Sequence, residues 1–317
     1  MAGTPGAKWD LKKGLKKCTL NYKMNRYKQT FKKLEKNKEK ALVPFVVVGD
    51  PDYKTSLEIV KTIIDNSADI LELGMPFSDP IADGPTIQAA DVRSQNSGMD
   101  TDKFLNFIKE VRSYNKKIPI GILIYSNLIY QRTIDKFYKD AKEAGIDSVL
   151  IADLPIEEAD EYIKAARKNK IDTVFIVSPL TSNQRLKQIT KKVKGFIYVV
   201  SRLGVTGART ELQKGTLDLL KRIRPQTNLP LCVGFGISTP DHVKEIIKAG
   251  ADGAIVGSAI VKIIENNLDN KPNTIKNIAN FIKSLKLSTM PKGFRSEASK
   301  PFRKIKDFSK SLEMSEK

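Results

Sequence analysis

Short apolar segments rich in Val, Ile and Leu recur along the chain, and amphipathic segments separate them. Such runs are typical of strands that are buried on both faces of a parallel sheet. The predicted strands are 42–48, 68–74, 118–124, 147–151, 172–178, 195–200, 229–234 and 252–256. The intervening segments predict helices near 55–66, 102–115, 133–143, 156–170, 183–192, 214–224 and 239–249. A further helix is expected over 26–40, where Tyr27, Phe31 and Leu34 repeat at spacings of four and three.

Eight strands, each followed by a helix, within about 240 residues predict a single α/β domain, the (β/α)8 or TIM barrel. The alternative is a doubly wound open sheet, but no Gly-x-Gly-x-x-Gly pattern follows the first strand. Several helix–strand junctions end in Asp, at 66–69, 143–147 and 248–252. The Gly in the latter two suits a left-handed helix C-cap.

The positive charge of the chain lies mainly at its two ends. The 317 residues carry a formal net charge of +19, yet residues 41–261 hold 29 Lys and Arg against 27 acids. Residues 1–40 hold 13 basic residues against 3 acids, and residues 262–317 hold 13 against 6. We therefore expect a basic N-terminal extension (1–23), a barrel domain that includes the extra helix (24–288) and a basic C-terminal tail (289–317).

Composition excludes several classes of protein and site. No run of about 18 apolar residues occurs, so no membrane span is expected. Cys18, Cys232 and His242 are the only Cys and His residues, which excludes a disulfide framework, a thiolate zinc site and a multi-His metal site. His242 lies near a predicted helix start, where a surface or capping role is expected. A cytoplasmic location is expected, and organellar import is the alternative because the N-terminus is poor in acids.

Three carboxylates lie at the end of the second predicted strand or in the loop after it, where barrels carry reactive groups. Alternation along 70–74 directs Leu71 and Leu73 toward the outer helices, and Glu72 into the barrel. Burial would raise the pKa of Glu72 toward neutrality and suit it to acid–base catalysis. Asp79 and Asp83 lie in the next loop, which three prolines and a glycine stiffen. For Glu72 the alternative is a structural salt bridge. For Asp79 and Asp83 it is ordinary turn chemistry.

Glycines after the last two predicted strands suggest an anion site. Gly234 and Gly236 follow the seventh strand, and Gly257 and Ser258 follow the eighth at the start of a helix. Backbone N–H groups at a helix N-terminus bind phosphate, and barrels often use these two loops for it. The alternative is that these glycines only turn the chain.

Two tyrosines at strand ends, Tyr125 and Tyr198, suit either a pocket or the core.

The segment 71–88 (LELGMPFSDPIADGPTIQ) resembles the signature of the tryptophan synthase α subunit family. Segments 45–51, 201–207, 234–236 and 256–258 match that family in the same order, and the resemblance covers about 24–288. It implies a (β/α)8 fold and the retro-aldol cleavage of indole-3-glycerol phosphate to indole and glyceraldehyde 3-phosphate. Val47 departs from the family, where Thr is common. Family members often begin near Met24, so Met1 and Met24 are both candidate start sites.

The resemblance also implies roles for individual residues. Glu72 would move protons between the indole C3 and the glycerol hydroxyl, and Asp83 would accept the indole N–H. The implied substrate-binding residues are Phe45, Leu123, Tyr125, Tyr198 and Phe235 around the ring, and Thr206, Gly207, Gly236, Gly257 and Ser258 near the phosphate. No cofactor or metal is expected on this chain.

The family further implies a partner, a β subunit that carries pyridoxal phosphate, in an α2β2 heterotetramer. The loop Ser78–Pro80, with Asp79, would contact that subunit and couple the two sites. Two alternatives stay open. One is a freestanding indole-3-glycerol phosphate lyase, and the other is a barrel scaffold whose basic arms bind a polyanion such as nucleic acid.

Overall fold

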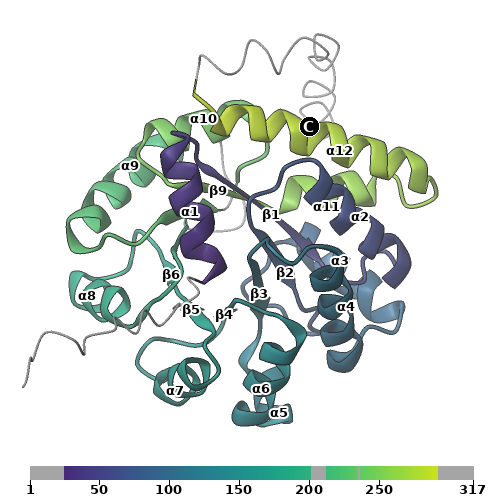
Figure 1. Cartoon of the computed structure of the whole chain (residues 1–317), viewed down its shortest axis with the longest axis horizontal. Coiled ribbons are helices and arrows are strands. Elements are labelled where there is room, and N and C mark those ends of the chain that lie inside the picture. Colours follow the sequence, from purple (N-terminus) through teal and green to yellow (C-terminus); the bar gives the residue numbers. More distant parts are fainter. Residues whose placement is uncertain (1–24, 201–211, 235, 292–317) are drawn as a thin grey trace, which may run out of the picture.

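A computed structural model describes residues 25–200, 212–234 and 236–291, and within them helices surround a ring of parallel strands (Figure 1). The strands are β1 (Ala41–Val47), β2 (Leu71–Gly74), β3 (Ile120–Ile124), β4 (Ser148–Ile151), β5 (Asp172–Val174), β6 (Ile176–Val177), β7 (Ile197–Val200), β8 (Leu231–Gly234) and β9 (Gly253–Val256). Their order in the sheet is β5-β4-β3-β2-β1-β9-β8-β7-β6.

The barrel has nine described strands rather than the eight predicted, because the fifth predicted strand divides at Phe175. Its first half, β5, pairs with β4, and its second half, β6, pairs with β7. The two edge strands of the sheet are therefore consecutive in the chain and close the ring through a covalent connection. The predicted barrel architecture is confirmed, and a local break in one strand accounts for the extra element.

The helices cover the outer surface of this ring. They are α1 (Arg26–Lys36), α2 (Tyr53–Asp65), α3 (Pro85–Asn96), α4 (Thr101–Tyr114), α5 (Ser126–Arg132), α6 (Ile134–Ala144), α7 (Asp160–Lys168), α8 (Asn183–Lys192), α9 (Leu212–Ile223), α10 (Pro240–Lys248), α11 (Ser258–Glu265) and α12 (Lys271–Thr289). The sequence pattern did not predict α3, α5 or α12. The buried face of α3 includes Asp91 and Ser94 beside Ile87 and Ala90, so no continuous apolar stripe marks that helix.

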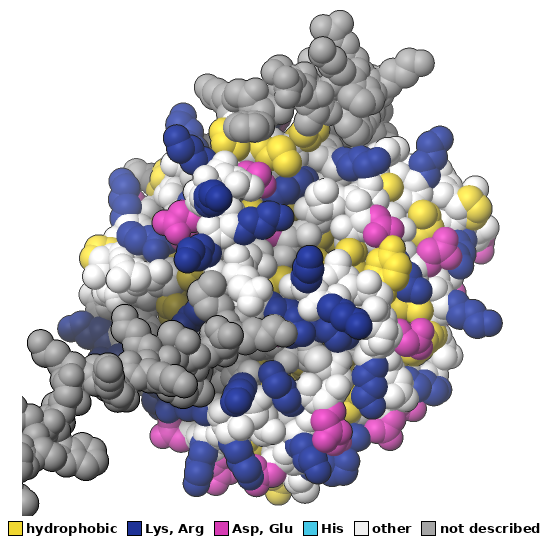
Figure 2. Space-filling view, viewed as in Figure 1, with side chains coloured by type: hydrophobic (Ala, Val, Ile, Leu, Met, Phe, Trp, Pro, Cys, Tyr) yellow, Lys and Arg dark blue, Asp and Glu magenta, His cyan; other side chains and the backbone are white. Residues whose placement is uncertain are grey.

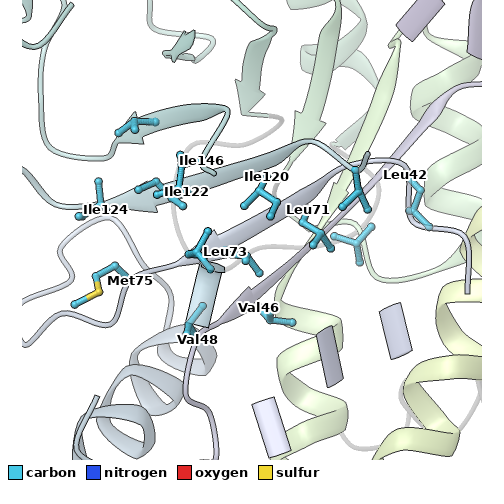
Figure 3. Close-up of a cluster of buried hydrophobic side chains, with 14 of the residues drawn as sticks. Leu42, Val46, Val48, Leu71, Leu73, Met75, Ile120, Ile122, Ile124 and Ile146 are labelled. Carbon is cyan, nitrogen blue, oxygen red and sulfur yellow. The ribbon is translucent and has the colours of Figure 1, made fainter. Parts of the chain in front are cut away.

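The principal core lies between the strands and the outer helices. Alternate residues of three neighbouring strands point outward, among them Leu42 and Val46 of β1, Leu71 and Leu73 of β2 and Ile122 of β3 (Figure 3). All five are at most 2% exposed. The prediction that Leu71 and Leu73 face the helices is therefore confirmed.

A second apolar cluster fills the barrel interior and includes Val43, Val47 and Ile70. Helix α1 closes the N-terminal end of this interior by adding Tyr27 and Leu34 to the cluster, and it crosses in front of the strands in Figure 1. The Tyr27 hydroxyl lies 2.7 Å from Ser148 Oγ on β4. The extra helix thus acts as a plug, and it ends at Lys36 rather than at residue 40.

The shared Asp at the helix–strand junctions has a structural explanation. Gly145 and Gly250 adopt φ values of 93° and 100°, as predicted for left-handed C-caps. The following Asp147 accepts the backbone N–H of Ile120 at 2.9 Å, and Asp252 accepts that of Leu231 at 3.1 Å. Each carboxylate therefore satisfies the first donor of a neighbouring strand. These residues stabilise the N-terminal end of the barrel. Active sites of such barrels lie at the opposite end, at the C-terminal ends of the strands.

Asp69 likewise accepts the backbone N–H of Leu42, at 2.8 Å. A buried lysine compensates the charge of this carboxylate. Lys286 on α12 is 6% exposed, and its Nζ lies 2.9 Å from Asp69 Oδ2 and 2.9 Å from Glu39. We expect Lys286→Ala to lower the free energy of unfolding by about 3–5 kcal/mol, because removing one partner leaves a buried carboxylate uncompensated. Denaturant unfolding measures this. Lys283→Ala on the exposed face of α12 is the control, and an equal effect of the two substitutions would contradict the argument.

The outer surface of the described residues is polar. Figure 2 shows Lys and Arg side chains spread over the face crossed by α1 and mixed with Asp and Glu. On α1 itself Lys28, Lys32, Lys33 and Lys36 are exposed. No helix in the described ranges is long and apolar enough to cross a membrane, and no cluster of three potential metal-ligating His, Cys, Asp or Glu side chains occurs within them.

Candidate functional site

Glu72 lies inside the barrel near the C-terminal end of β2, as the alternation along that strand predicts. It is 3% exposed, and its Oε2 accepts no hydrogen bond from any described residue. Burial, followed by the negative charge of Asp83, raises the pKa of Glu72 to about 8. An uncompensated buried carboxyl is costly, because low polarity disfavours its charged form. The salt-bridge alternative therefore finds no support here, and the group can donate or accept a proton near neutral pH.

Asp83 approaches Glu72 from the loop that follows β2, and a tyrosine fixes its position. The Tyr125 hydroxyl donates to Asp83 Oδ2 at 2.7 Å and accepts the Ala82 backbone N–H at 3.1 Å. The Tyr125 ring stacks on Phe77, with 4.8 Å between ring centroids. Burial raises the pKa of Asp83, and the hydrogen bond from Tyr125 opposes that rise. The loop thus holds a second carboxylate in one orientation beside the buried acid.

Aromatic and aliphatic side chains surround the two carboxylates. Phe45 of β1 pairs with Glu72 in the sheet register and is 6% exposed. Tyr198 of β7 is 5% exposed, and both Glu72 and Asp83 contribute to its raised pKa after burial. Leu123 of β3 packs against the same interior cluster. The structure therefore places Phe45, Leu123 and Tyr198 in the barrel interior and Tyr125 beside Asp83.

Two glycines create the space that the aromatic rings occupy. A Cβ at Gly257 would lie 2.9 Å from Phe45 Cδ1, and one at Gly234 would lie 2.7 Å from Tyr198 Cζ. Both distances are too short for real carbon atoms. Glycine at these strand ends is therefore needed for close packing of the pocket, in addition to any anion contact.

The two predicted anion loops lie at the C-terminal ends of β8 and β9. Gly257 is the N-cap of α11, and the exposed Ser258 is its first residue. Gly236 adopts a φ of 71°, a conformation that favours glycine. The free N–H groups of a helix N-terminus attract phosphate. Among the other predicted contacts, Thr206, Gly207 and Phe235 lie outside the described residues.

The segment Ser78–Pro80 forms a turn at the outer side of the site. Ser78 Oγ donates to Asp79 Oδ2 at 2.5 Å, and both side chains are exposed. The next residue, Ile81, is 84% exposed. The turn therefore presents Asp79 and an apolar side chain to the surroundings rather than to the barrel interior.

His242 and Cys232 lie outside the predicted site, and their contacts indicate structural roles. His242 lies in the first turn of α10, where its Nδ1 accepts the Ser238 backbone N–H at 3.3 Å. Its own N–H donates to the N-cap Thr239, so the expected capping environment is confirmed. Cys232 is buried in the barrel interior, while Cys18 lies outside the described residues.

One residue near the site was missed by the sequence analysis. Asp91 lies on the buried face of α3 and is 4% exposed, although the sequence offers only an isolated polar residue in an unrecognised helix. Burial raises its pKa to about 8, and the negative charges of Asp83 and Asp50 add to that rise. A further buried carboxyl group therefore lies close enough to Asp83 to respond to its charge.

Comparison with known proteins agrees with this geometry. The family model described as "Tryptophan synthase alpha chain" matches residues 31–290. The chain is 50% identical over 246 residues to the tryptophan synthase alpha chain of Methanothermobacter thermautotrophicus, covering 78% of this chain and 91% of the relative. It is 47% identical over 266 residues to that of Vibrio cholerae, covering 84% and 99% of the two chains.

Solved structures give the same result. Tryptophan synthase subunit alpha from Legionella pneumophila superposes with a TM-score of 0.77 at 32% identity, over 84% of this chain and 98% of that one. A chain from the tryptophan synthase a2b2 complex of Pyrococcus furiosus gives 0.72 at 38% identity, over 78% and 98%. The chain therefore belongs to the tryptophan synthase alpha chain family, the lyases that cleave indole-3-glycerol phosphate.

Proposed function

We propose that Glu72 and Asp83 carry the cleavage of indole-3-glycerol phosphate to indole and glyceraldehyde 3-phosphate in this chain. The observation that supports this most strongly is the pair itself. A buried carboxyl with no hydrogen-bond partner on Oε2 among the described residues lies near a carboxylate that Tyr125 orients. The apolar wall around the pair suits an indole ring, and the α11 N-terminus suits its phosphate tail.

In the proposed mechanism Glu72 acts first as an acid and then as a base. Its neutral carboxyl donates a proton to the indole C3, and the ring becomes a cationic indolenine. The resulting carboxylate then removes the proton of the hydroxyl on the adjacent glycerol carbon. The bond from that carbon to C3 breaks, the carbon becomes the aldehyde, and the electron pair restores the aromatic indole. A pKa of about 8 suits both steps near neutral pH.

Asp83 has a different function, because it stabilises charge rather than transferring a proton. As its carboxylate it accepts the indole N–H, whose positive charge grows as C3 is protonated. An interaction that strengthens along the reaction lowers the barrier, whereas one of constant strength does not. Tyr125 supports this role because its hydroxyl already donates to Oδ2, which favours the ionised carboxylate.

We also propose that the barrel mouth, the end formed by the C-terminal ends of the strands, docks a β subunit that carries pyridoxal phosphate. Three large apolar side chains from loops or short helices at this end are strongly exposed: Ile81 (84%), Tyr130 (72%) and Leu180 (75%). Apolar side chains rimmed by polar ones are typical of interaction sites. The related chain from Pyrococcus furiosus belongs to an a2b2 complex, which supports an α2β2 assembly here.

The division into a basic extension (1–23), a barrel domain (24–288) and a basic tail (289–317) is retained as a proposal. The family match over 31–290 supports the extent of the barrel, and helix α12 extends it to Thr289. Cytoplasmic location stays a prediction.

The experiment that tests the proposed function is the release of indole from indole-3-glycerol phosphate by the full chain, with and without a β subunit. We expect slow release by the chain alone and strong stimulation by the partner. Fast release that the partner leaves unchanged would favour the freestanding lyase. No release in either case would contradict the proposed activity and direct attention to polyanion binding by the basic ends.

A further inference from the structure

Three hydrogen bonds hold Asp83 in the loop between β2 and α3. The Tyr125 hydroxyl donates to the carboxylate at 2.7 Å, and the Asp83 backbone N–H donates to the Pro80 carbonyl at 3.0 Å. The third bond comes from α3, where Gln88 Nε2 donates to the Asp83 backbone carbonyl at 2.8 Å. The side chain, the N–H and the carbonyl of this one residue are therefore all fixed.

Packing and helix formation do not account for the amide of Gln88. Its side chain is exposed on the first part of α3, outside the apolar core. The N-cap of that helix is Gly84, which makes no side-chain capping bond. Gln88 instead reaches back past the start of the helix to a carbonyl five residues earlier. Because an exposed helix position accepts any good helix former, the bond to Asp83 is what distinguishes this residue.

Helix α3 is itself fixed to the segment that follows β1. Arg93 makes two hydrogen bonds to Asp50, at 2.7 and 3.0 Å, and the Asp50 side chain is 0% exposed. Ser94 Oγ donates to the Val48 carbonyl at 2.6 Å. A helix with these attachments has a fixed position relative to the end of β1, so a bond from it ties the main chain of Asp83 to the barrel.

Resting on the proposed function, we propose that Gln88 is a positioning residue for the cleavage reaction. Tyr125 sets the rotation of the Asp83 side chain, and Gln88 sets the position of the main chain from which that side chain extends. Together they direct the carboxylate toward the indole nitrogen. A displacement of about 1 Å in a catalytic geometry costs about 100-fold in rate, so the main-chain bond matters even though the carboxylate has its own partner.

The first test removes the N–H donor without changing the length of the side chain. Methionine resembles glutamine in length and helix propensity but has no N–H group. We expect Gln88→Met to lower kcat for indole release by about 5- to 20-fold, between the loss of one hydrogen bond and a full misplacement. KM should change less than about twofold, because the ground-state contacts remain. Gln95→Met, two turns further along α3, is the matched control and should change neither quantity.

A double variant tests whether Gln88 acts through Asp83. In an Asp83→Ala chain the carboxylate that Gln88 positions is already gone, so adding Gln88→Met should lower the remaining single-turnover rate by less than about twofold. Equal losses in the two backgrounds would show a general effect on the fold and would overturn the proposal. A Gln88→Met variant with the parent kcat would overturn it as well.

Hydrogen exchange at the Ala82 and Asp83 amides gives a readout that does not depend on turnover. Both N–H groups are bonded in the parent chain, at 3.1 and 3.0 Å. Gln88→Met should speed their exchange by about tenfold, because the loop opens more often, and should leave the Leu73 amide of β2 unchanged. Unchanged exchange at both loop amides would contradict the proposal. If the parent chain releases no indole, the proposed function fails, and the exchange rates still show whether Gln88 holds the loop.

Discussion

Replacing Glu72 with Gln should reduce the turnover of indole-3-glycerol phosphate by about 10³-fold or more while the chain stays folded. General acid–base catalysis by one group contributes about 10²- to 10⁴-fold, and Glu72 is proposed to act in both directions. Glutamine has the same shape but can neither donate an acidic proton to C3 nor remove one from the hydroxyl. The ring and phosphate contacts proposed above do not involve this carboxyl, so substrate affinity should change only a few-fold.

Single-turnover measurements of indole formation give the rate of the chemical step, and substrate titration gives the affinity. Together they separate an effect on catalysis from an effect on binding. Glu58→Gln on the exposed side of α2 is the matched control and should leave both unchanged. A Glu72→Gln variant within tenfold of the parent kcat would assign the proton transfers to another group. A large rise in KM at constant kcat would instead indicate a binding role for Glu72.

The barrel and its buried acid could be predicted because both depend on local alternation. Val, Ile and Leu at successive positions indicate strands buried on both faces, and the position of Glu72 between Leu71 and Leu73 determines its direction. These relations extend over a few residues of one strand, so no knowledge of distant contacts is needed. The resemblance of 71–88 to a known family then supplied roles that alternation alone leaves open.

The features that were missed depend on contacts between distant segments. Helix α3 buries Asp91 and Ser94, and the Ser94 hydroxyl donates to the Val48 carbonyl at 2.6 Å on another part of the chain. In sequence these polar residues indicate an exposed segment, and only the fold shows what they bind. The division of β5 from β6 has the same origin, because each half follows a different neighbouring strand around the closing barrel.

Glu72→Gln should also make the protein more stable, and the gain should depend on pH. An unfolded Glu titrates near 4.5, whereas burial raises the pKa of Glu72 in the folded chain to about 8. Between these values the folded state retains a proton that the unfolded state has lost. The free energy of unfolding of the parent chain therefore falls as pH rises through this window. Glutamine does not ionise, so the variant lacks this loss.

The difference in free energy of unfolding between the Glu72→Gln variant and the parent chain should be small below pH 4.5. It should grow through pH 7 and level off above about pH 8. Each pKa unit corresponds to about 1.4 kcal/mol, so the plateau should reach about 3–5 kcal/mol. Urea unfolding at pH 4, 7 and 9 measures it, with Glu58→Gln as a control that should show no such trend. A gain that is the same at every pH would mean that Gln packs better than Glu and that ionisation is not the cause. A gain that follows pH, together with loss of turnover, would show that the group needed for proton transfer is held in the barrel at a cost to stability.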